Sequence, residues 1–435
     1  MTNSDQSIPD GGDSADRVRR PWWQSIGPGL VTACVVIGPG SILTSSQVGA
    51  REGYSRAWVV LIAVIFMMAY VTMAARLGAV ARQSTGDIIT QRAGRWLAVL
   101  MGICVFLISA TFQFGNNLGA HSAIAAFVPW NHWVLVLNAV SIAFVFAFRN
   151  LYAALERLMT FFVAVMLISF AVNLWFAQPN IGEFAQGLIP SAGSAEIGLE
   201  LLGLIGTTFV ISAAYYQSYL VRFRGWTKDD LPAGLVDARV GGAIMLLITL
   251  MIMSTAAAVL RGQELKDVGQ VAQQLEPLFG TKGRIIFCIG LFSAAFSSFI
   301  INSMIGGFIL SDGLGLGSVP TERVPRILTT VVLLTGMLVA MYVLNTGRKP
   351  VNAIIAAQAV TVLAAPLMAG VLLWLTNLRS VMGEFRNGLV LNLFGIGGLI
   401  LLLVTARYTA VEKVWPEVEK LLNPPPAAIP VGHFE

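Results

Sequence analysis

Long apolar runs recur along the whole chain, and this feature constrains the fold most. A helix needs about 20 consecutive apolar residues to cross the hydrocarbon core of a bilayer. Only 12% of the 435 residues are charged, about half of the usual share in a soluble domain. The chain therefore cannot form the water-exposed surface of a soluble protein of this length. The sequence predicts an all-α polytopic membrane protein with eleven transmembrane helices. Their approximate ranges are 26–50, 57–80, 97–127, 132–148, 155–176, 199–222, 240–260, 285–310, 327–345, 351–377 and 388–408.

Polar segments flank the predicted membrane domain, which covers residues 25–409. Residues 1–24 are expected to form a disordered tail without a signal peptide, because no apolar stretch opens the chain. Residues 410–435 contain three consecutive prolines at 424–426 and are expected to form a C-terminal tail. The chain is therefore predicted to have one membrane domain and two tails.

Basic residues are concentrated in alternate loops. With the N-terminus inside, most of the 28 Lys and Arg residues fall on the inner side, and the first three outer loops hold only Arg51 and Arg56. Because Lys and Arg favour cytoplasmic loops, the N-terminus is expected in the cytoplasm and the C-terminus outside it. The expected location is the plasma or inner membrane. The net charge of +5 has this topological origin and does not indicate a nucleic-acid partner.

Enzymatic chemistry has no support in the sequence. The three cysteines, Cys34, Cys104 and Cys288, lie inside apolar stretches and are interpreted as core residues. No nucleophile–base arrangement, Cys/His cluster or phosphate-binding loop is apparent. We expect no catalytic residue and no cofactor. The expected partners are the lipid bilayer and a small solute or ion, and the oligomeric state is not predicted.

The first span contains Gly38, Pro39 and Gly40 at mid-membrane depth. Unwound backbone at that depth is tolerated only where protein or a water-filled cavity surrounds it; a simple proline kink is the alternative. A second polar cluster, residues 212–218, lies in the sixth span. Spans one and six occupy corresponding places in two five-helix halves. Paired interruptions of this kind are typical of inverted-repeat secondary transporters with a site at the midplane.

Four segments in order resemble one family. They are residues 27–54, Ala75-Arg76-Leu77-Gly78, residues 276–307 and Met382-Gly383-Glu384-Phe385-Arg386-Asn387. Together they resemble the NRAMP (natural resistance-associated macrophage protein) metal transporters over most of the chain. The resemblance implies the APC-superfamily (leucine-transporter-like) fold, a 5+5 inverted repeat with broken helices 1 and 6. It also implies cation import coupled to protons.

The family's charged and soft metal and proton residues do not match this sequence, whereas the glutamine of the tenth helix matches Gln358. The Asp and Asn of the family's Asp-Pro-Gly-Asn motif fall on Gly38 and Ser41. The Met-Pro-His-Asn motif of the sixth helix falls on residues 210–213, and a second histidine of that helix falls on Gln217. The acidic pair of the third helix falls on Gln113 and Asn116. No metal site is therefore expected to be intact, and Gln113, Asn116 and Gln217 mark former proton-path positions.

The replacements change the expected substrate. A transition-metal site of this type needs a carboxylate for charge and a thioether for soft preference, and an uncompensated dication is costly to desolvate. Two half-helix N-termini would instead favour an anion or a carboxylate-bearing or neutral polar solute. The candidate substrate-binding residues are Gly38, Pro39, Gly40, Ser41, Thr44, Val210, Ser212, Ala213, Tyr215 and Gln358.

Other readings stay open. One is a divalent-cation transporter (Mn²⁺, Fe²⁺ or Mg²⁺) with an altered site, in which carbonyls and water hold the ion. Another is a channel-like or uniport protein, and a third is a non-transporting sensor or scaffold. The polar residues could also serve only to hydrogen-bond one helix to another.

Overall fold

The computed structural model describes residues 27–416 and 419, except for 82, 149, 191–198, 266–267 and 348–350. For 199–200, 268, 273–279, 351–363 and 413, only the backbone is described. Within these ranges the structure is helical and contains no strand. Most of the two predicted tails lies outside the described residues.

The first half of the chain begins with a helix pair, α1 (Pro28–Val36) and α2 (Pro39–Glu52), whose axes differ by 58°. A short helix, α4, precedes the long α5, and α8 follows α7. The remaining elements of this half are α3 (Ala57–Val80), α4 (Thr85–Ala93), α5 (Arg95–Ala125), α6 (Trp133–Ala147), α7 (Leu151–Ala177) and α8 (Ile181–Gly187).

The second half begins with another interrupted pair, α9 (Leu199–Thr208) and α10 (Ile211–Phe223). A 3₁₀ turn, η2 (Lys228–Asp230), leads into α11 (Leu231–Val259), and α12 (Val268–Leu314) is kinked at Gly280. The remaining elements are α13 (Arg323–Thr346), α14 (Val351–Asn377), α15 (Arg379–Met382), the 3₁₀ turn η3 (Gly383–Phe385), α16 (Leu389–Thr409) and the π-helical turn η4 (Ala410–Val414).

Seven of the described helices are long and apolar enough to span a membrane, and up to nine spans result if each of two bent pairs counts as one. Each of the eleven predicted ranges coincides with a helix or helix pair, but α6 has only 15 residues. The number eleven therefore stays a prediction. The boundaries also differ: α11 begins nine residues before the predicted position 240, because Thr227 and Asp230 form a capping box ahead of it.

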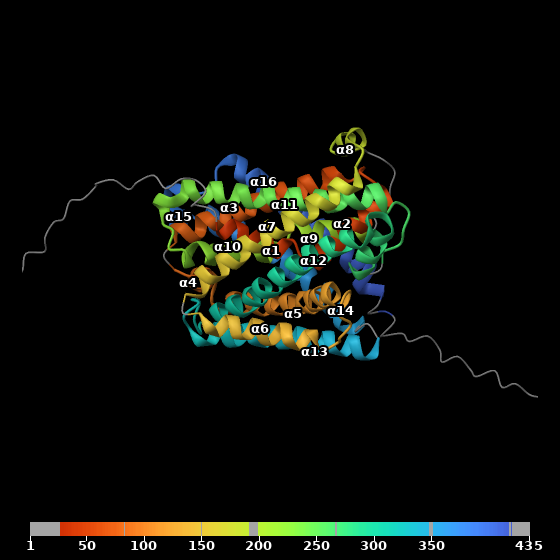
Figure 1. Ribbon diagram of the computed structural model, residues 1–435. Coiled ribbons are helices and arrows are strands. Elements are labelled where there is room, and N and C mark those ends of the chain that lie inside the picture. The colour runs from red at the N-terminus through yellow and green to blue at the C-terminus, as the bar shows by residue number, and fades with distance from the viewer. Residues whose placement is uncertain are drawn as a thin grey trace, which may run out of the picture.

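The long helices run roughly in one direction across Figure 1, with α4 and α10 toward one end and α2 and α9 toward the other. We call the face at which α1 begins the α1 side and the opposite face, at which α2 ends, the α2 side. Helices α1 and α11 touch through their backbones: a Cβ atom added at Gly241 would lie 2.5 Å from the carbonyl oxygen of Gly29. All of α1 is buried, so the two halves pack tightly around the first break.

Candidate functional site

The first helix breaks where the glycines and proline predicted it. Helix α1 ends at Val36 and α2 begins at Pro39, with Gly38 extended between them. No described side chain caps the N-terminus of α2. The next backbone hydrogen bond runs from the Ile42 N–H to the Gly38 carbonyl. Since a helix leaves its first N–H groups without intrahelical acceptors, those of Gly40 and Ser41 have no partner among the described residues.

The second break is similar. Helix α9 ends at Thr208 and α10 begins at Ile211, and no described side chain caps α10. The N–H groups of Ala213 and Ala214 both donate to the Val210 carbonyl, which leaves those of Ile211 and Ser212 without a described acceptor. The N-termini of α2 and α10 thus present free N–H groups and the positive ends of two helix dipoles.

Gly38 faces the central helices α5 and α12. A Cβ atom at this position would lie 3.0 Å from the Ser298 hydroxyl and 3.5 Å from the Asn116 side-chain oxygen. The Ser298 hydroxyl donates to the Val35 carbonyl at 3.2 Å, so it occupies one of the carbonyls freed at the end of α1. Pro39 packs directly on Gly119 of α5. The first break is therefore crowded by neutral residues at Gly38 and Pro39, whereas Gly40 is exposed.

A network of side-chain amides extends from the break into α5, α6 and α12. Asn138 donates to the Asn117 side-chain oxygen at 2.7 Å, and Asn117 donates to the backbone carbonyl of Gln113 at 2.8 Å. Asn302 donates to the Ser109 carbonyl at 2.8 Å. Gln113 is fully buried, and its amide nitrogen has no hydrogen-bond partner. The network is polar and contains no ionisable side chain.

Two side-chain hydrogen bonds join the broken helices to each other. On the α2 side, the hydroxyls of Thr44 and Thr207 are 2.9 Å apart and link α2 to α9. On the α1 side, the Thr32 hydroxyl donates to the Gln217 side-chain oxygen at 2.5 Å and links α1 to α10. Each break therefore lies between two polar contacts, one on either side.

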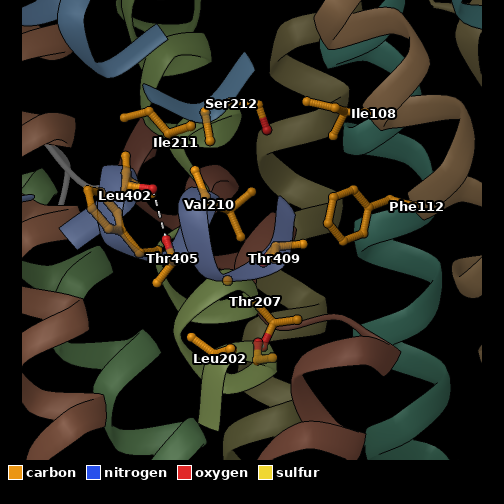
Figure 2. A pocket seen from close by; sticks show the side chains of 15 residues that line it. Ile108, Phe112, Leu202, Thr207, Val210, Ile211, Ser212, Leu402, Thr405 and Thr409 are labelled. Atoms are coloured by element: carbon orange, nitrogen blue, oxygen red, sulfur yellow. Dashed lines mark hydrogen bonds between the residues drawn. The ribbon is translucent and has the colours of Figure 1, made fainter. Parts of the chain in front are cut away.

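A cavity of about 240 Å³ opens at the second break. Figure 2 shows Ile108 and Phe112 of α5 on one side of it and Leu402 and Thr405 of α16 on the other. Its lining residues are Ile108, Phe112, Leu202, Gly203, Gly206, Thr207, Phe209, Val210, Ile211, Ser212, Ala365, Leu402, Thr405, Ala406 and Thr409. None of these side chains is acidic, basic, sulfur-containing or an imidazole.

The buried carboxylates of Asp237 and Asp312 do not line this cavity, and both accept hydrogen bonds from other groups. Asp237 of α11 accepts the backbone N–H groups of Gly27 and Gly29, at 2.7 Å each, and so caps α1. Asp312 of α12 accepts hydrogen bonds from the Ser84 hydroxyl, the Gly86 N–H and the Tyr219 hydroxyl at 2.5, 2.8 and 2.5 Å. In the described part of the chain, no three His, Cys, Asp or Glu side chains cluster as a metal site would require.

Sequence comparisons with known proteins point to one family. Residues 29–412 match the model of the natural resistance-associated macrophage protein-like (Nramp) family. This chain belongs to the NRAMP family. A protein of Acidiphilium cryptum described as a divalent metal cation transporter is 25% identical over 405 residues, which cover 89% of this chain and 92% of the relative. A protein of Deinococcus radiodurans with the same description is 25% identical and covers 82% and 83%.

Solved structures confirm the predicted fold. A manganese transporter of Eremococcus coleocola superposes with a TM-score of 0.77 at 19% identity, over 97% of this chain and 91% of that one. A Na⁺-coupled sialic acid symporter superposes with a TM-score of 0.57 at 11% identity, over 88% and 89%. The NRAMP chain is thus a membrane transporter with broken helices in both halves of an inverted repeat.

The structure brings some of the predicted residues together. Val210 and Ser212 line the cavity at the second break, and a Cβ atom at Gly40 would lie 3.6 Å from the Thr207 methyl group. Thr44 contacts Thr207 as well. The hydroxyl of Ser41 is buried without a hydrogen-bond partner. The two breaks therefore adjoin each other, as a shared site requires.

Other predicted residues lie apart from the cavity. Tyr215 is 1% exposed, and its ring centroid is 6.1 Å from that of Tyr219, toward the α1 side. Ala213 is buried and does not line the cavity. Gln217 is engaged with Thr32. The side chain of Gln358 in α14 lies outside what the structure describes.

The sequence interpretation missed part of the lining. Thr207 lies five residues before the polar cluster of the sixth span, and this proximity was a usable signal. Thr405 and Thr409 of α16 are four residues apart and therefore share one helix face. Phe112 adjoins Gln113 on α5, but an aromatic residue in an apolar run gives no signal of its own. Helix α16 lies outside both five-helix halves, so the repeat did not point to it.

Proposed function

We propose that this NRAMP transporter moves a small solute without net positive charge, anionic or neutral and polar, by alternating access. The observation that carries the proposal is the chemistry of the two breaks. They present the free N–H groups of Gly40, Ser41, Ile211 and Ser212. The side chains nearest to Gly38 and Gly40 are neutral, and no carboxylate, thioether or imidazole lines the cavity at the second break.

A cation at the two breaks would need negative charge nearby to compensate its own. Two helix N-termini carry a partial positive charge of about half a unit each, and a dication between them would be repelled. A carboxylate at the position of Gly38 would reverse that balance, but glycine supplies none. Asp237 and Asp312 do not replace it, because each already accepts hydrogen bonds from the N-terminal turn of another helix, α1 or α4.

Transport of a divalent cation is the second candidate. It is favoured by the relatives, which are described as divalent metal cation transporters and match over most of this chain at 25% identity. In that case, backbone carbonyls at the ends of α1 and α9, the Asn116 side-chain oxygen and retained water would hold the ion. Hard cations such as Mg²⁺ keep several waters when bound, so this version would bind Mg²⁺ no more weakly than Mn²⁺.

The candidate site comprises both breaks: Gly38 to Ser41 with Thr44 in the first, and Val210 with Ser212 in the second.

The distribution of basic residues supports an orientation in a plasma or inner membrane with the N-terminus and the α1 side facing the cytoplasm. Neutral Gln113 and Asn116 stand where the family carries an acidic pair. We therefore infer that Gln113 and Asn116 do not couple transport to a proton gradient.

Uptake of Mn²⁺ into proteoliposomes with a trapped quenchable dye tests the proposal, with the Deinococcus radiodurans relative as positive control. We expect no quenching above that of empty vesicles at micromolar Mn²⁺. Quenching at micromolar concentration would establish the metal candidate instead. A thermal-shift screen of carboxylates, bicarbonate, amino acids and metals follows, because a ligand at 100 times its Kd adds about 2.7 kcal/mol of stability. A transport-dead sensor or scaffold is supported if no solute shifts the midpoint.

A further inference from the structure

The cavity at the second break has apolar walls and, at the N-terminus of α10, a group of hydrogen-bond donors that we call the polar end. Its volume of about 240 Å³ lies between α5, the junction of α9 with α10, α14 and α16. Four lining residues carry hydroxyls, namely Thr207, Ser212, Thr405 and Thr409, and those of Thr207 and Thr405 are hydrogen-bonded within the protein. The other lining residues are apolar or glycine, and Figure 2 shows how Ile108, Phe112, Leu202 and Leu402 surround the space.

The polar end contains unused hydrogen-bond donors. Ser212 is 5% exposed and lines the cavity, and its hydroxyl makes no hydrogen bond in the described structure. The N–H groups of Ile211 and Ser212 are also unpartnered, at the first turn of a 13-residue helix. Donors that line a cavity without a partner are available to a ligand, and a helix N-terminus favours negative charge. The group that fits this end is an oxyanion.

The walls require more than an oxyanion. Phe112, Leu202 and Leu402 present apolar surface to the same space. A small inorganic anion would leave that surface facing water, whereas an alkyl or aryl group would bury it. Burial of one methylene improves affinity by about fourfold. The ligand that uses both parts of the cavity therefore has a charged head and an apolar body.

The volume limits the size of that body. A protein cavity of about 150 Å³ holds a benzene molecule. A cavity of about 240 Å³ has room for a carboxylate with roughly four to six carbons. Chains much longer than this would have to leave the cavity.

We propose that the substrate is a short-chain monocarboxylate bound at the second break. Its carboxylate accepts hydrogen bonds from the N–H groups of Ile211 and Ser212 and from the Ser212 hydroxyl. Its apolar body lies between Phe112 and Leu402. This inference rests on the proposed function, because it assigns a substrate class to the same site.

Binding to the full-length protein in lipid nanodiscs tests the inference by thermal shift. The probes are acetate, butyrate and hexanoate, each compared with the amide and the primary amine of the same chain length. We expect the apparent affinity of the acids to rise about fourfold per methylene up to hexanoate. The amides should bind at least tenfold more weakly, and the amines should give no shift.

Single substitutions test whether the carboxylates bind in this cavity. A Cβ atom at Gly206 meets no atom within 4 Å, so Gly206→Leu fills the cavity without displacing the backbone. It should weaken hexanoate at least tenfold. Gly370→Leu on α14 is the matched control, since its Cβ is equally free and the residue does not line the cavity; it should bind hexanoate like the wild type. Ser212→Ala should weaken acetate and hexanoate equally, by about fivefold to tenfold.

The outcomes separate the two proposals. Equal binding of acids and amides, or no effect of chain length, overturns the monocarboxylate assignment. Equal loss in Gly206→Leu and Gly370→Leu overturns its location. If neither the acids nor Mn²⁺ bind, the monocarboxylate assignment fails while the proposed function stands. Micromolar binding of Mn²⁺ in the same preparation overturns the proposed function itself.

Discussion

Thr32 and Gln217 join the two broken helices on the α1 side, where the Thr32 hydroxyl donates to the Gln217 side-chain oxygen at 2.5 Å. Both residues are buried, and the amide nitrogen of Gln217 has no partner of its own. The contact therefore links α1 to α10 through a hydrogen bond between two buried side chains. Separation of α1 from α10 requires that this bond break.

Thr32→Val removes the donor and leaves the Gln217 oxygen buried without a partner. The expected cost to the packed arrangement is about 1–2 kcal/mol, which raises the population with α1 displaced about tenfold. Cys34 of α1 reports on this population, because its side chain is 0% exposed. In a background with Cys104→Ala and Cys288→Ala, maleimide should label Cys34 about tenfold faster in the variant.

The matched control is Thr335→Val on α13, where the threonine hydroxyl donates only to the Val331 carbonyl of its own helix. Its labelling rate should equal that of the background. An unchanged rate in Thr32→Val would show that the bond does not restrain α1.

Thr44 and Thr207 form the corresponding contact on the α2 side. Each single change to valine leaves the other hydroxyl without its cross-helix partner, at an expected cost of about 1 kcal/mol. The double change removes both and should cost less than the sum of the two. A double-mutant cycle on unfolding free energy should give a coupling of about 0.5–1 kcal/mol. Strict additivity would show that the 2.9 Å contact contributes nothing.

Asp237 holds the first turn of α1 through two backbone N–H groups. Asp237→Asn keeps the size but turns one acceptor into a donor that faces an N–H group. We expect a loss of about 2 kcal/mol and a thermal midpoint lower by several degrees. Asp229→Asn is the control, because Asp229 is exposed in η2, and its midpoint should not change. Equal midpoints in the two variants would contradict the capping role.

Local composition favoured a broken first helix, because Pro39 lacks a backbone donor and Gly38 and Gly40 have low helix propensity. A simple proline kink was the alternative, and the structure has the break. The sixth span was harder to interpret. Its break falls at Phe209 and Val210, and neither residue disfavours a helix as proline does. That break follows from the packing of α9 and α10 in the repeat, so it was predicted by analogy with the first.

Contacts between distant residues could not be predicted. Asp237 and Gly27 are 210 residues apart, and nothing in either sequence segment points to the other. The cavity also depends on α16, which follows both halves of the repeat and supplies Thr405 and Thr409. A pattern of residues within one helix identifies polar positions, but only the packing of several helices decides which of them face a common space.

Restoration of the family's metal ligands tests the role of charge at the first break. Gly38→Asp supplies a carboxylate, Ser41→Asn an amide oxygen, and Val210→Met a thioether from the second break. The three together provide the hard and soft ligands of a transition-metal site, so the triple variant should bind Mn²⁺ at micromolar concentration in calorimetry. Gly38→Asp alone should not, because one carboxylate leaves the remaining positions to hydroxyls.

The geometry of Gly38 sets a condition on this prediction. Its Cβ would lie 3.0 Å from the Ser298 hydroxyl, which must shift by a few tenths of an ångström to admit any side chain. The matched control therefore replaces Gly38 by Asn in the same triple variant, with equal crowding and no charge. If charge decides the substrate, only the aspartate triple binds Mn²⁺. Binding by the asparagine triple or by the unaltered protein would mean that neutral ligands suffice, and the loss of the carboxylate would then not exclude a metal.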